Sequence, residues 1–244
     1  MSARLVGIGV GPGDPELVTV KAARELAEAD IVVVPVADLA ERGRAEAVVA
    51  RYTQPEKVRR VVFALTAPAE GRGPGEAREA AWDAAAAAVG ALLDAHATVA
   101  FATLGDPAIY STFGYLAQTV TAARPDVRID TVPGVMALAD LASRAGLTLV
   151  EGTETLMLVP LTAGPEVFAR ALDAADTVVA YKTGRRLPEA LATLDAAGRR
   201  DDAVLGAGLG TADQVLQAGG DIAAAPYFAT LAVTPRRPTR GGRL

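Results

Sequence analysis

Cysteine is absent from this sequence of 244 residues, and histidine occurs once. The lack of cysteine excludes disulfides, thiolate metal sites and a cysteine nucleophile. The single histidine, His96, follows an alanine-rich stretch, where a basic side chain offsets the negative end of a helix dipole. We therefore expect neither a histidine-based zinc site nor a Ser-His-Asp triad, and we assign no metal-binding residues.

Long apolar runs and blocks of like charge are missing too. No apolar run approaches the ~18 residues that a membrane-spanning helix needs, and the N-terminus reaches Asp14 too soon for a signal peptide. The net charge is −5, and no basic face indicates nucleic-acid binding. These absences predict a soluble cytoplasmic protein without nucleic-acid or membrane partners, in which a local arginine cluster can still hold an anionic small molecule.

The sequence does contain a regular alternation of apolar runs and helix-like segments. Continuous apolar runs such as Ile31–Pro35 are typical of parallel strands buried on both faces. The alternation predicts an α/β protein with a sizeable core. The predicted strands are residues 5–10, 31–35, 58–63, 99–103, 127–132, 156–160, 177–181, 203–206 and 229–233.

Proline and glycine punctuate this pattern. Arg124-Pro125 ends a predicted helix that starts near Tyr110, and we place a domain boundary there. The predicted domains are residues 1–124 and 125–235, followed by a disordered, arginine-rich tail of residues 236–244. Residues 66–75 are rich in proline and glycine, and we expect them to be mobile.

The stretch around Leu104-Gly-Asp-Pro107 organises the rest of the chain. A buried strand, a tight turn and a helix follow one another here, which is where α/β sheets expose backbone groups to ligands. Gly105 lets the main chain approach a ligand closely, and Pro107 suits a helix start. On these residues alone, a ligand-binding turn and an ordinary loop capped by Asp106 remain equally open.

A second glycine-rich turn follows the first predicted strand, with glycines at positions 7, 9, 11 and 13. The dinucleotide fingerprint fails here in both frames, because its last position is Pro12 or Asp14. A phosphate-binding Walker A loop fails as well, since no Gly-Lys-Ser/Thr follows. This turn therefore lacks the phosphate chemistry of either motif, although its backbone can still approach a ligand.

Four motifs in one order carry a resemblance to a known family: Val6–Lys21, Ala29–Pro35, Leu104–Phe113 and Val132–Val135. Together they resemble the tetrapyrrole methylases, the S-adenosylmethionine-dependent enzymes of cobalamin and sirohaem synthesis. Each motif alone is weak, but their order and spacing are specific, and the similarity extends to about Val233. The sequence after Gly-Asp-Pro, the Glu154-Thr-Leu stretch and Ala180–Arg185 are similar to the branch that methylates precorrin-2 at C20.

The resemblance implies two α/β domains: an N-terminal one with a mainly parallel sheet and flanking helices, and a C-terminal one with a mixed sheet and helices. It also implies a cofactor cleft between them and a homodimer. After Val204-Leu205 the chain departs from the family, which often has an acidic residue and a polar stretch there. The cofactor contacts implied by position are Pro12, Leu104, Gly105, Asp106, Ile109, Met136, Ala137, Lys182 and, in the divergent Gly206–Gly210 stretch, Gly208 or Leu209.

Methyl transfer from a sulfonium needs no protein nucleophile when the acceptor carbon is electron-rich, as in a reduced tetrapyrrole. Catalysis then depends on positioning and on stabilising the charge that leaves sulfur. Tyr110 is the candidate catalytic residue, with the role of ordering the substrate or helping proton loss. The alternative is that its ring only packs against its neighbours. Arg42, Arg44 and Arg185 lie in predicted loops after strands and suit the carboxylates of the substrate.

Two alternatives stay open at this point. Within the family, the chain methylates another ring position or acts on cobalt-factor II in place of metal-free precorrin-2. Outside it, the chain is a nucleotide- or phosphate-binding α/β module without methyl transfer, although the motifs that such a module needs are not present.

Overall fold

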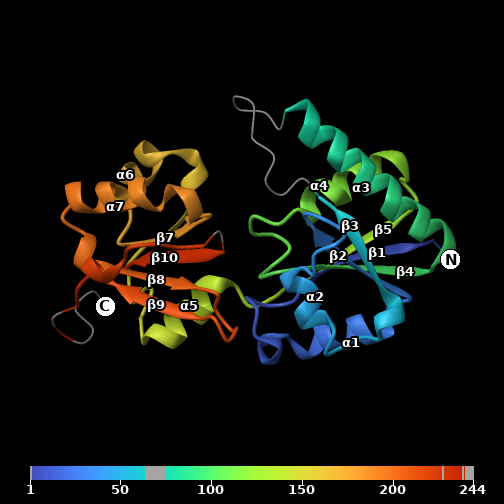
Figure 1. The fold of residues 1–244 in the computed structure, drawn as a ribbon, viewed down its shortest axis with the longest axis horizontal. Helices are drawn as coiled ribbons and strands as arrows, with labels where there is room; N and C mark the ends of the chain where they lie inside the picture. The colour runs from blue at the N-terminus through green and yellow to red at the C-terminus, as the bar shows by residue number, and fades with distance from the viewer. Residues whose placement is uncertain (1, 64–74, 227, 238, 240–244) are drawn as a thin grey trace. The chain divides into compact units, whose positions relative to one another are not determined.

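The computed structural model describes residues 2–63, 75–226, 228–237 and 239 (Figure 1). The chain divides into two compact units, Met1–Met136 and Ala137–Leu244. Each unit contains one five-stranded sheet with helices packed on it, which confirms the predicted α/β class with a parallel and a mixed sheet.

The first unit holds a parallel sheet of strand order β3-β2-β4-β1-β5. Alternate residues of β1 enter opposite layers of the core, Leu5 on one face and Val6 on the other. Helices α1 and α2 pack on the Val6 face, and α3 and α4 on the Leu5 face. The elements are β1 Arg4–Gly9, α1 Val20–Glu28, β2 Ile31–Val36, α2 Arg44–Val49, β3 Val58–Val62, α3 Glu76–Ala95, β4 Thr98–Thr103, α4 Phe113–Ala123 and β5 Arg128–Val132.

The second unit holds a mixed sheet of order β6-β7-β10-β8-β9, in which only β6 and β7 run parallel. Its core is built around fully buried side chains such as Phe168, Leu194 and Leu205. Helices α6 and α7 lie on one side of the sheet and α5 on the other (Figure 1). The elements are α5 Ala137–Ala145, β6 Leu156–Pro160, α6 Pro165–Ala174, β7 Thr177–Tyr181, α7 Leu187–Ala196, β8 Ala203–Ala207, β9 Val215–Ala218 and β10 Ala229–Val233.

Several boundaries differ from those expected. Strand β5 follows the predicted boundary at Pro125 but pairs with β1, so the first unit continues to Met136. The helix expected from Tyr110 begins at Phe113, because Tyr110 has a positive φ of 51°. Strand β9 was not predicted, because its four residues are largely exposed and carry no alternating apolar pattern.

Part of the predicted disordered tail makes defined contacts. Arg236 Nε lies 2.6 Å from Asp202 Oδ1, and Arg237 pairs with Glu154. Residues 238 and 240–244 lie outside the described residues. Most of the segment expected to be mobile, residues 66–74, lies outside them too.

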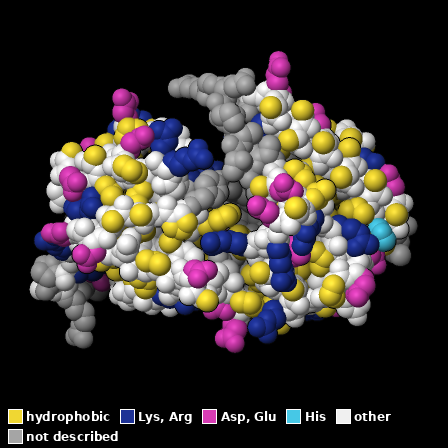
Figure 2. All heavy atoms as spheres, in the orientation of Figure 1, with side chains coloured by type: hydrophobic (Ala, Val, Ile, Leu, Met, Phe, Trp, Pro, Cys, Tyr) yellow, Lys and Arg dark blue, Asp and Glu magenta, His cyan; other side chains and the backbone are white. Residues whose placement is uncertain are grey.

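Figure 2 shows acidic, basic and hydrophobic side chains interspersed on the visible face of each unit. Within the residues that the structure describes, no helix is long and apolar enough to cross a membrane.

Candidate functional site

In the first unit, the turns that follow β1, β4 and β5 meet at the carboxyl ends of these neighbouring strands. Gly105 N donates to Gly11 O at 2.7 Å, which joins the first turn to the central one. Val10 N donates to Thr103 O at 2.9 Å just before them. Helix α1 lies on one face of the sheet and α4 on the other, so these turns open at the kind of edge where α/β proteins bind ligands.

The glycines of these turns are required by backbone contact. A Cβ on Gly9 would lie 2.5 Å from Gly105 O and 2.6 Å from Gly134 N, and a Cβ on Gly134 would overlap Gly105 O. Gly105 itself has φ +67°, and nothing lies within 4 Å of the position that its Cβ would take. Three backbones are therefore packed against one another, while one side of Gly105 stays open to a ligand.

Asp106 holds two of these turns together. Its Oδ2 accepts from Gly134 N at 3.0 Å and its Oδ1 from Ala108 N at 2.8 Å. Because α4 begins only at Phe113, Asp106 caps the turn and not the helix. The alternative of a loop capped by Asp106 therefore holds for the turn, but it does not exclude a ligand. Each carboxylate oxygen can accept a further hydrogen bond, so a contact with a ligand is compatible with this role.

Ser111, which the sequence did not single out, accepts the backbone N–H of the first residue of α4, a role that Asp106 does not take. Its Oγ accepts from Phe113 N at 3.1 Å and lies 2.9 Å from Thr103 Oγ1 at the end of β4. Its position two residues before a helix was the available signal, since serine favours helix starts. The helix predicted from Tyr110 hid this signal by placing Ser111 inside the helix.

Tyr110 and Lys182 share an uncommon backbone conformation. In the described part of the chain, they are the two non-glycine residues with positive φ, at 51° and 58°. Such residues cluster at functional sites, where the surrounding structure holds them. Tyr110 is 43% exposed, and partial burial raises the pKa of its hydroxyl. Both residues are among those selected from the sequence.

In the second unit, the end of β7 contacts the start of α5. Tyr181 Oη accepts from Leu138 N at 3.2 Å, which satisfies one backbone donor of the first helical turn. Thr183 is fully buried and donates from Oγ1 to Ala229 O at 3.1 Å. These bonds fix the chain on both sides of Lys182 and tie the end of β7 to the start of α5, which begins at Ala137.

The divergent loop after β8 is ordered by its own packing. Gly208 has φ +60°, and Thr211 Oγ1 donates to Gly208 O at 2.7 Å. Leu209 is 5% exposed, and its side chain packs against Gly206. The Leu209 side chain is thus used within the unit, and a ligand contact in this loop is left to the backbone.

Every residue predicted to bind the cofactor follows the carboxyl end of a strand or starts α5. Two groups result, one in each unit, and direct contact of these residues with a cofactor stays a prediction. Pro12, Leu104, Gly105, Asp106, Ile109 and Met136 lie in the first unit, and Ala137, Lys182, Gly208 and Leu209 in the second.

The predicted substrate arginines lie at exposed or partly exposed positions. The Arg42 side chain is 58% exposed, and its Nε is 3.7 Å from Glu46 Oε1. Glu46 is held more closely by Arg60, at 2.7 and 2.9 Å, so the contact with Arg42 is secondary. Arg44 is the first residue of α2, and Arg185 is exposed in a short 3-10 helix after β7. In the part of the chain that the structure describes, no group of His, Cys, Asp or Glu has the arrangement of a metal site.

A model of the family "Tetrapyrrole (Corrin/Porphyrin) Methylases" matches residues 4–220. The chain is 35% identical over 204 residues to a precorrin-2 C(20)-methyltransferase of Sinorhizobium sp, covering 82% of each protein. It is 32% identical over 206 residues to the cobalt-precorrin-2 C(20)-methyltransferase of Salmonella typhimurium, covering 84% of this chain and 83% of that one. It is also 35% identical to the cobalamin biosynthesis protein CobIJ of Mycobacterium tuberculosis, of which it spans about half, 47%.

Solved structures share the fold. The cobalt precorrin-4 methyltransferase CbiF has a TM-score of 0.69 at 20% identity, over 95% of this chain and 94% of that one. The uroporphyrin-III C-methyltransferase from Thermus thermophilus, complexed with S-adenosylhomocysteine, has a TM-score of 0.66 at 22% identity, over 95% and 97%.

Proposed function

The chain belongs to the tetrapyrrole (corrin/porphyrin) methylase family, and from this premise we propose that it transfers the methyl group of S-adenosylmethionine to C20 of precorrin-2, giving precorrin-3A in cobalamin biosynthesis. The observation that carries the proposal is the similarity to a precorrin-2 C(20)-methyltransferase over 82% of both proteins. The Salmonella relative supports a second substrate, the cobalt-containing form of the same ring. Cytoplasmic location and a homodimer are further parts of the proposal.

The residues of the central turn fit the cofactor. The open side of Gly105, where a Cβ would meet no atom within 4 Å, admits a ligand against the backbone. Asp106 is held by two backbone donors and can accept from a ribose hydroxyl or an amino group without moving. When bound, S-adenosylmethionine supplies an electrophilic methyl group. The corresponding contacts in the second unit are assigned to Ala137, Lys182 and the loop of Gly208 and Leu209.

The other residues of the proposed site orient the methyl donor and the tetrapyrrole. Fixed backbone geometry in the turns limits the reorganisation needed to align donor and acceptor, which is the main source of rate for such a displacement. Tyr110 is held in its strained conformation beside the central turn, where its ring orients the substrate. Arg42, Arg44 and Arg185 bind the carboxylates at the rim of the ring through planar guanidinium groups.

The test is incubation of the protein with ¹³C-methyl S-adenosylmethionine and either precorrin-2 or cobalt-factor II, followed by NMR assignment of the labelled carbon. Label at C20 supports the proposal, and the faster of the two substrates decides the metal state. Label at another carbon would move the chain to a different step of the pathway. Calorimetry with S-adenosylhomocysteine, NAD and ATP separates the last alternative, since a nucleotide-binding module binds NAD or ATP and a methylase binds only the first.

A further inference from the structure

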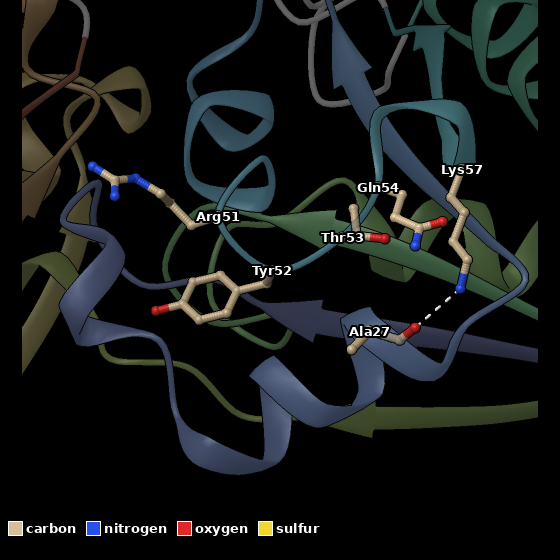
Figure 3. Close-up of a pocket in the computed structure, with 6 residues that line it drawn as sticks. All are labelled: Ala27, Arg51, Tyr52, Thr53, Gln54 and Lys57. Atoms are coloured by element: carbon tan, nitrogen blue, oxygen red, sulfur yellow. Dashed lines mark hydrogen bonds between the residues drawn. The ribbon is translucent and has the colours of Figure 1, made fainter.

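A cleft of about 330 Å³ lies in the first unit, between the end of α1 and the segment that leads into β3 (Figure 3). These residues precede β2 and β3, so the cleft lies at the amino ends of the strands, away from the turns at their carboxyl ends. The side chains that line it are those of Ala27, Arg51, Tyr52, Thr53, Gln54 and Lys57. Nothing in the methyl-transfer proposal uses them.

The cleft has a positively charged lining. Arg51 and Lys57 contribute two cations, and no carboxylate is among the lining residues that the structure describes. Lys57 Nζ donates to Ala27 O at 3.0 Å and to Ala29 O at 2.9 Å, the carbonyls at the end of α1. An ammonium group has three donors, so one N–H remains for a ligand. The two carbonyls also hold the ammonium in place before a ligand arrives, which lowers the entropic cost of binding.

Two uncharged polar side chains lie beside Lys57, as Figure 3 shows. Thr53 Oγ1 is buried and has no hydrogen-bond partner among the described residues, and such an atom in a native structure calls for an explanation. Gln54 precedes a short 3-10 helix, yet its side chain makes no capping hydrogen bond. The amide of Gln54, an exposed residue, can donate to oxygen atoms of a ligand directly, and the Thr53 hydroxyl can do so after rotation about its Cα–Cβ bond. Arg51 points away from this group and adds its charge at the rim.

Tyr52 forms a fixed wall of the cleft. Its hydroxyl donates to Pro15 O at 2.5 Å, which holds the ring across the gap between the segment before β3 and the chain before α1. The backbone here is ordered too, because Tyr52 N and Thr53 N both donate to Val49 O, at 2.9 and 3.1 Å. The cleft is therefore preformed, as small-molecule sites usually are.

We propose that this cleft is a second ligand site, which binds a small organic or inorganic anion through a phosphate or carboxylate group. The ammonium of Lys57, the hydroxyl of Thr53 and the amide of Gln54 donate to its oxygens, and Arg51 attracts it at the rim. The site does not depend on the identity of the methylated carbon and stands or falls independently of the proposed reaction.

The probes are inorganic pyrophosphate and citrate, titrated into the ¹⁵N-labelled full chain saturated with S-adenosylhomocysteine, with sodium chloride at matched ionic strength as the reference. Saturable shifts of the backbone amides of residues 51–54, 56 and 57 with pyrophosphate identify a phosphate site, and with citrate a carboxylate site. Shifts that sodium chloride reproduces, or no saturable shift with either probe, would overturn the proposal.

Two variants test the contacts themselves. Gln54→Glu places a negative charge in the cleft at nearly constant size, and we expect the dissociation constant to rise by roughly tenfold or more. Gln118→Glu, the same change at an exposed position of α4, is the matched control and should leave binding unchanged. Equal weakening of anion binding by both variants would show that the effect comes from the overall charge of the protein, and would refute the site.

Thr53→Val separates ligand binding from folding. The hydroxyl has no hydrogen-bond partner among the residues that the structure describes, so its replacement by a methyl group should keep or raise the melting temperature. Binding of the anion should weaken severalfold in the same protein. Methyl transfer should be unaffected in both cleft variants. An unchanged dissociation constant for Thr53→Val would remove Thr53 from the site, and together with an unchanged value for Gln54→Glu would refute the proposal.

Discussion

The two units hold their candidate residues by different means. In the first, three backbone turns touch directly at Gly9, Gly105 and Gly134, and a carboxylate bridges two of them. In the second, side chains make the contacts: Tyr181 reaches α5, and Leu141 and Leu209 fill the space over Gly206. Backbone contact tolerates no Cβ, whereas a side chain can rotate or shift. The first arrangement is therefore rigid and visible in the sequence, and the second is more tolerant and harder to detect.

Matched glycine substitutions give the largest effect and test this difference most directly. A Cβ on Gly134 overlaps a carbonyl oxygen, whereas a Cβ on Gly206 lies 2.6 Å from the end of the Leu141 side chain, which can move. We expect Gly134→Ala to lower the free energy of unfolding by about 3 kcal/mol and Gly206→Ala by about 1 kcal/mol. Denaturant unfolding measures both values, and calorimetry should find the binding of S-adenosylhomocysteine reduced in Gly134→Ala.

Gly114→Ala is the control for a change of residue without a change of contact. Gly114 lies in α4 with φ in the ordinary range, and nothing is within 4 Å of its Cβ position. Alanine should raise stability there by roughly 0.5–1 kcal/mol, because glycine is unfavourable inside a helix. Equal losses at positions 134 and 206 would show that the two units do not differ in rigidity.

The second comparison removes one polar side-chain group from each unit. Asp106→Ala leaves Gly134 N and Ala108 N without their acceptor, and we expect a loss of about 1.5–3 kcal/mol in unfolding free energy. Tyr181→Phe removes the neutral hydrogen bond from Leu138 N and should cost about 1 kcal/mol. A weaker affinity of Asp106→Ala for S-adenosylhomocysteine without any loss of stability would mean that Asp106 serves the ligand and not the turns.

The third comparison concerns the stability of the two units at acidic pH. Arg4 pairs with Glu25 at 2.7 Å and Asp130 at 2.6 Å, and its guanidinium holds the pKa of both carboxyls below their usual values of 4.5 and 3.8. A lowered pKa in the folded protein contributes stability that is complete above the ordinary pKa and is lost as pH falls through the lowered one. Arg4→Gln should therefore lower the melting temperature at pH 7, by the equivalent of about 1 kcal/mol for partly exposed pairs.

The difference between Arg4→Gln and the unaltered protein should shrink below about pH 4, because both carboxyls become protonated there. The second unit offers the counterpart, in which Arg237 lowers the pKa of Glu154. Arg237→Gln should show the same sign of pH dependence. Melting curves from pH 7 to 3 check both, and a pH-independent difference would show that the arginines contribute by packing alone.

The smallest effects on stability, and the clearest on kinetics, should come from the exposed arginines. Arg42→Ala with Arg44→Ala in the first unit, and Arg185→Ala in the second, should change unfolding free energy by roughly 0–1 kcal/mol. Each should raise KM for the tetrapyrrole, and the rise should shrink with added salt, since the Debye length falls below ~10 Å. Steady-state kinetics at two salt concentrations and a thermal melt decide this. An unchanged KM with a lowered melting temperature would assign these residues to the fold.

Local signals in the sequence predicted most strands and both glycine-rich turns. Tyr110 and Lys182 were selected with the family resemblance, and their positive φ was not predicted. They could not predict contacts between distant segments. Asp106 reaches Gly134 across 28 residues, and Arg237 reaches Glu154 across 83, so a tail that is polar in composition holds an ordered residue. The pairing of β5 with β1 is another contact between distant segments. It puts the division between the units after Met136, whereas the sequence predicted it near Pro125. In the second unit, the candidate positions came from family resemblance, because contacts made by side-chain packing produce no recognisable spacing of residues in the sequence.

The position of β1 has a consequence for synthesis. This strand precedes the other strands of its sheet in the chain, yet it lies between β4 and β5, the last two of them. Its partners at residues 98–103 and 128–132 leave the ribosome only after most of the first unit has been translated. Until then β1 lacks both of its partner strands, and exposed apolar surface with unpaired strand edges favours aggregation. The contact of Gly9 with Gly134 joins the two ends of this unit, so the edge that carries the candidate cofactor residues is complete only when the whole unit has emerged.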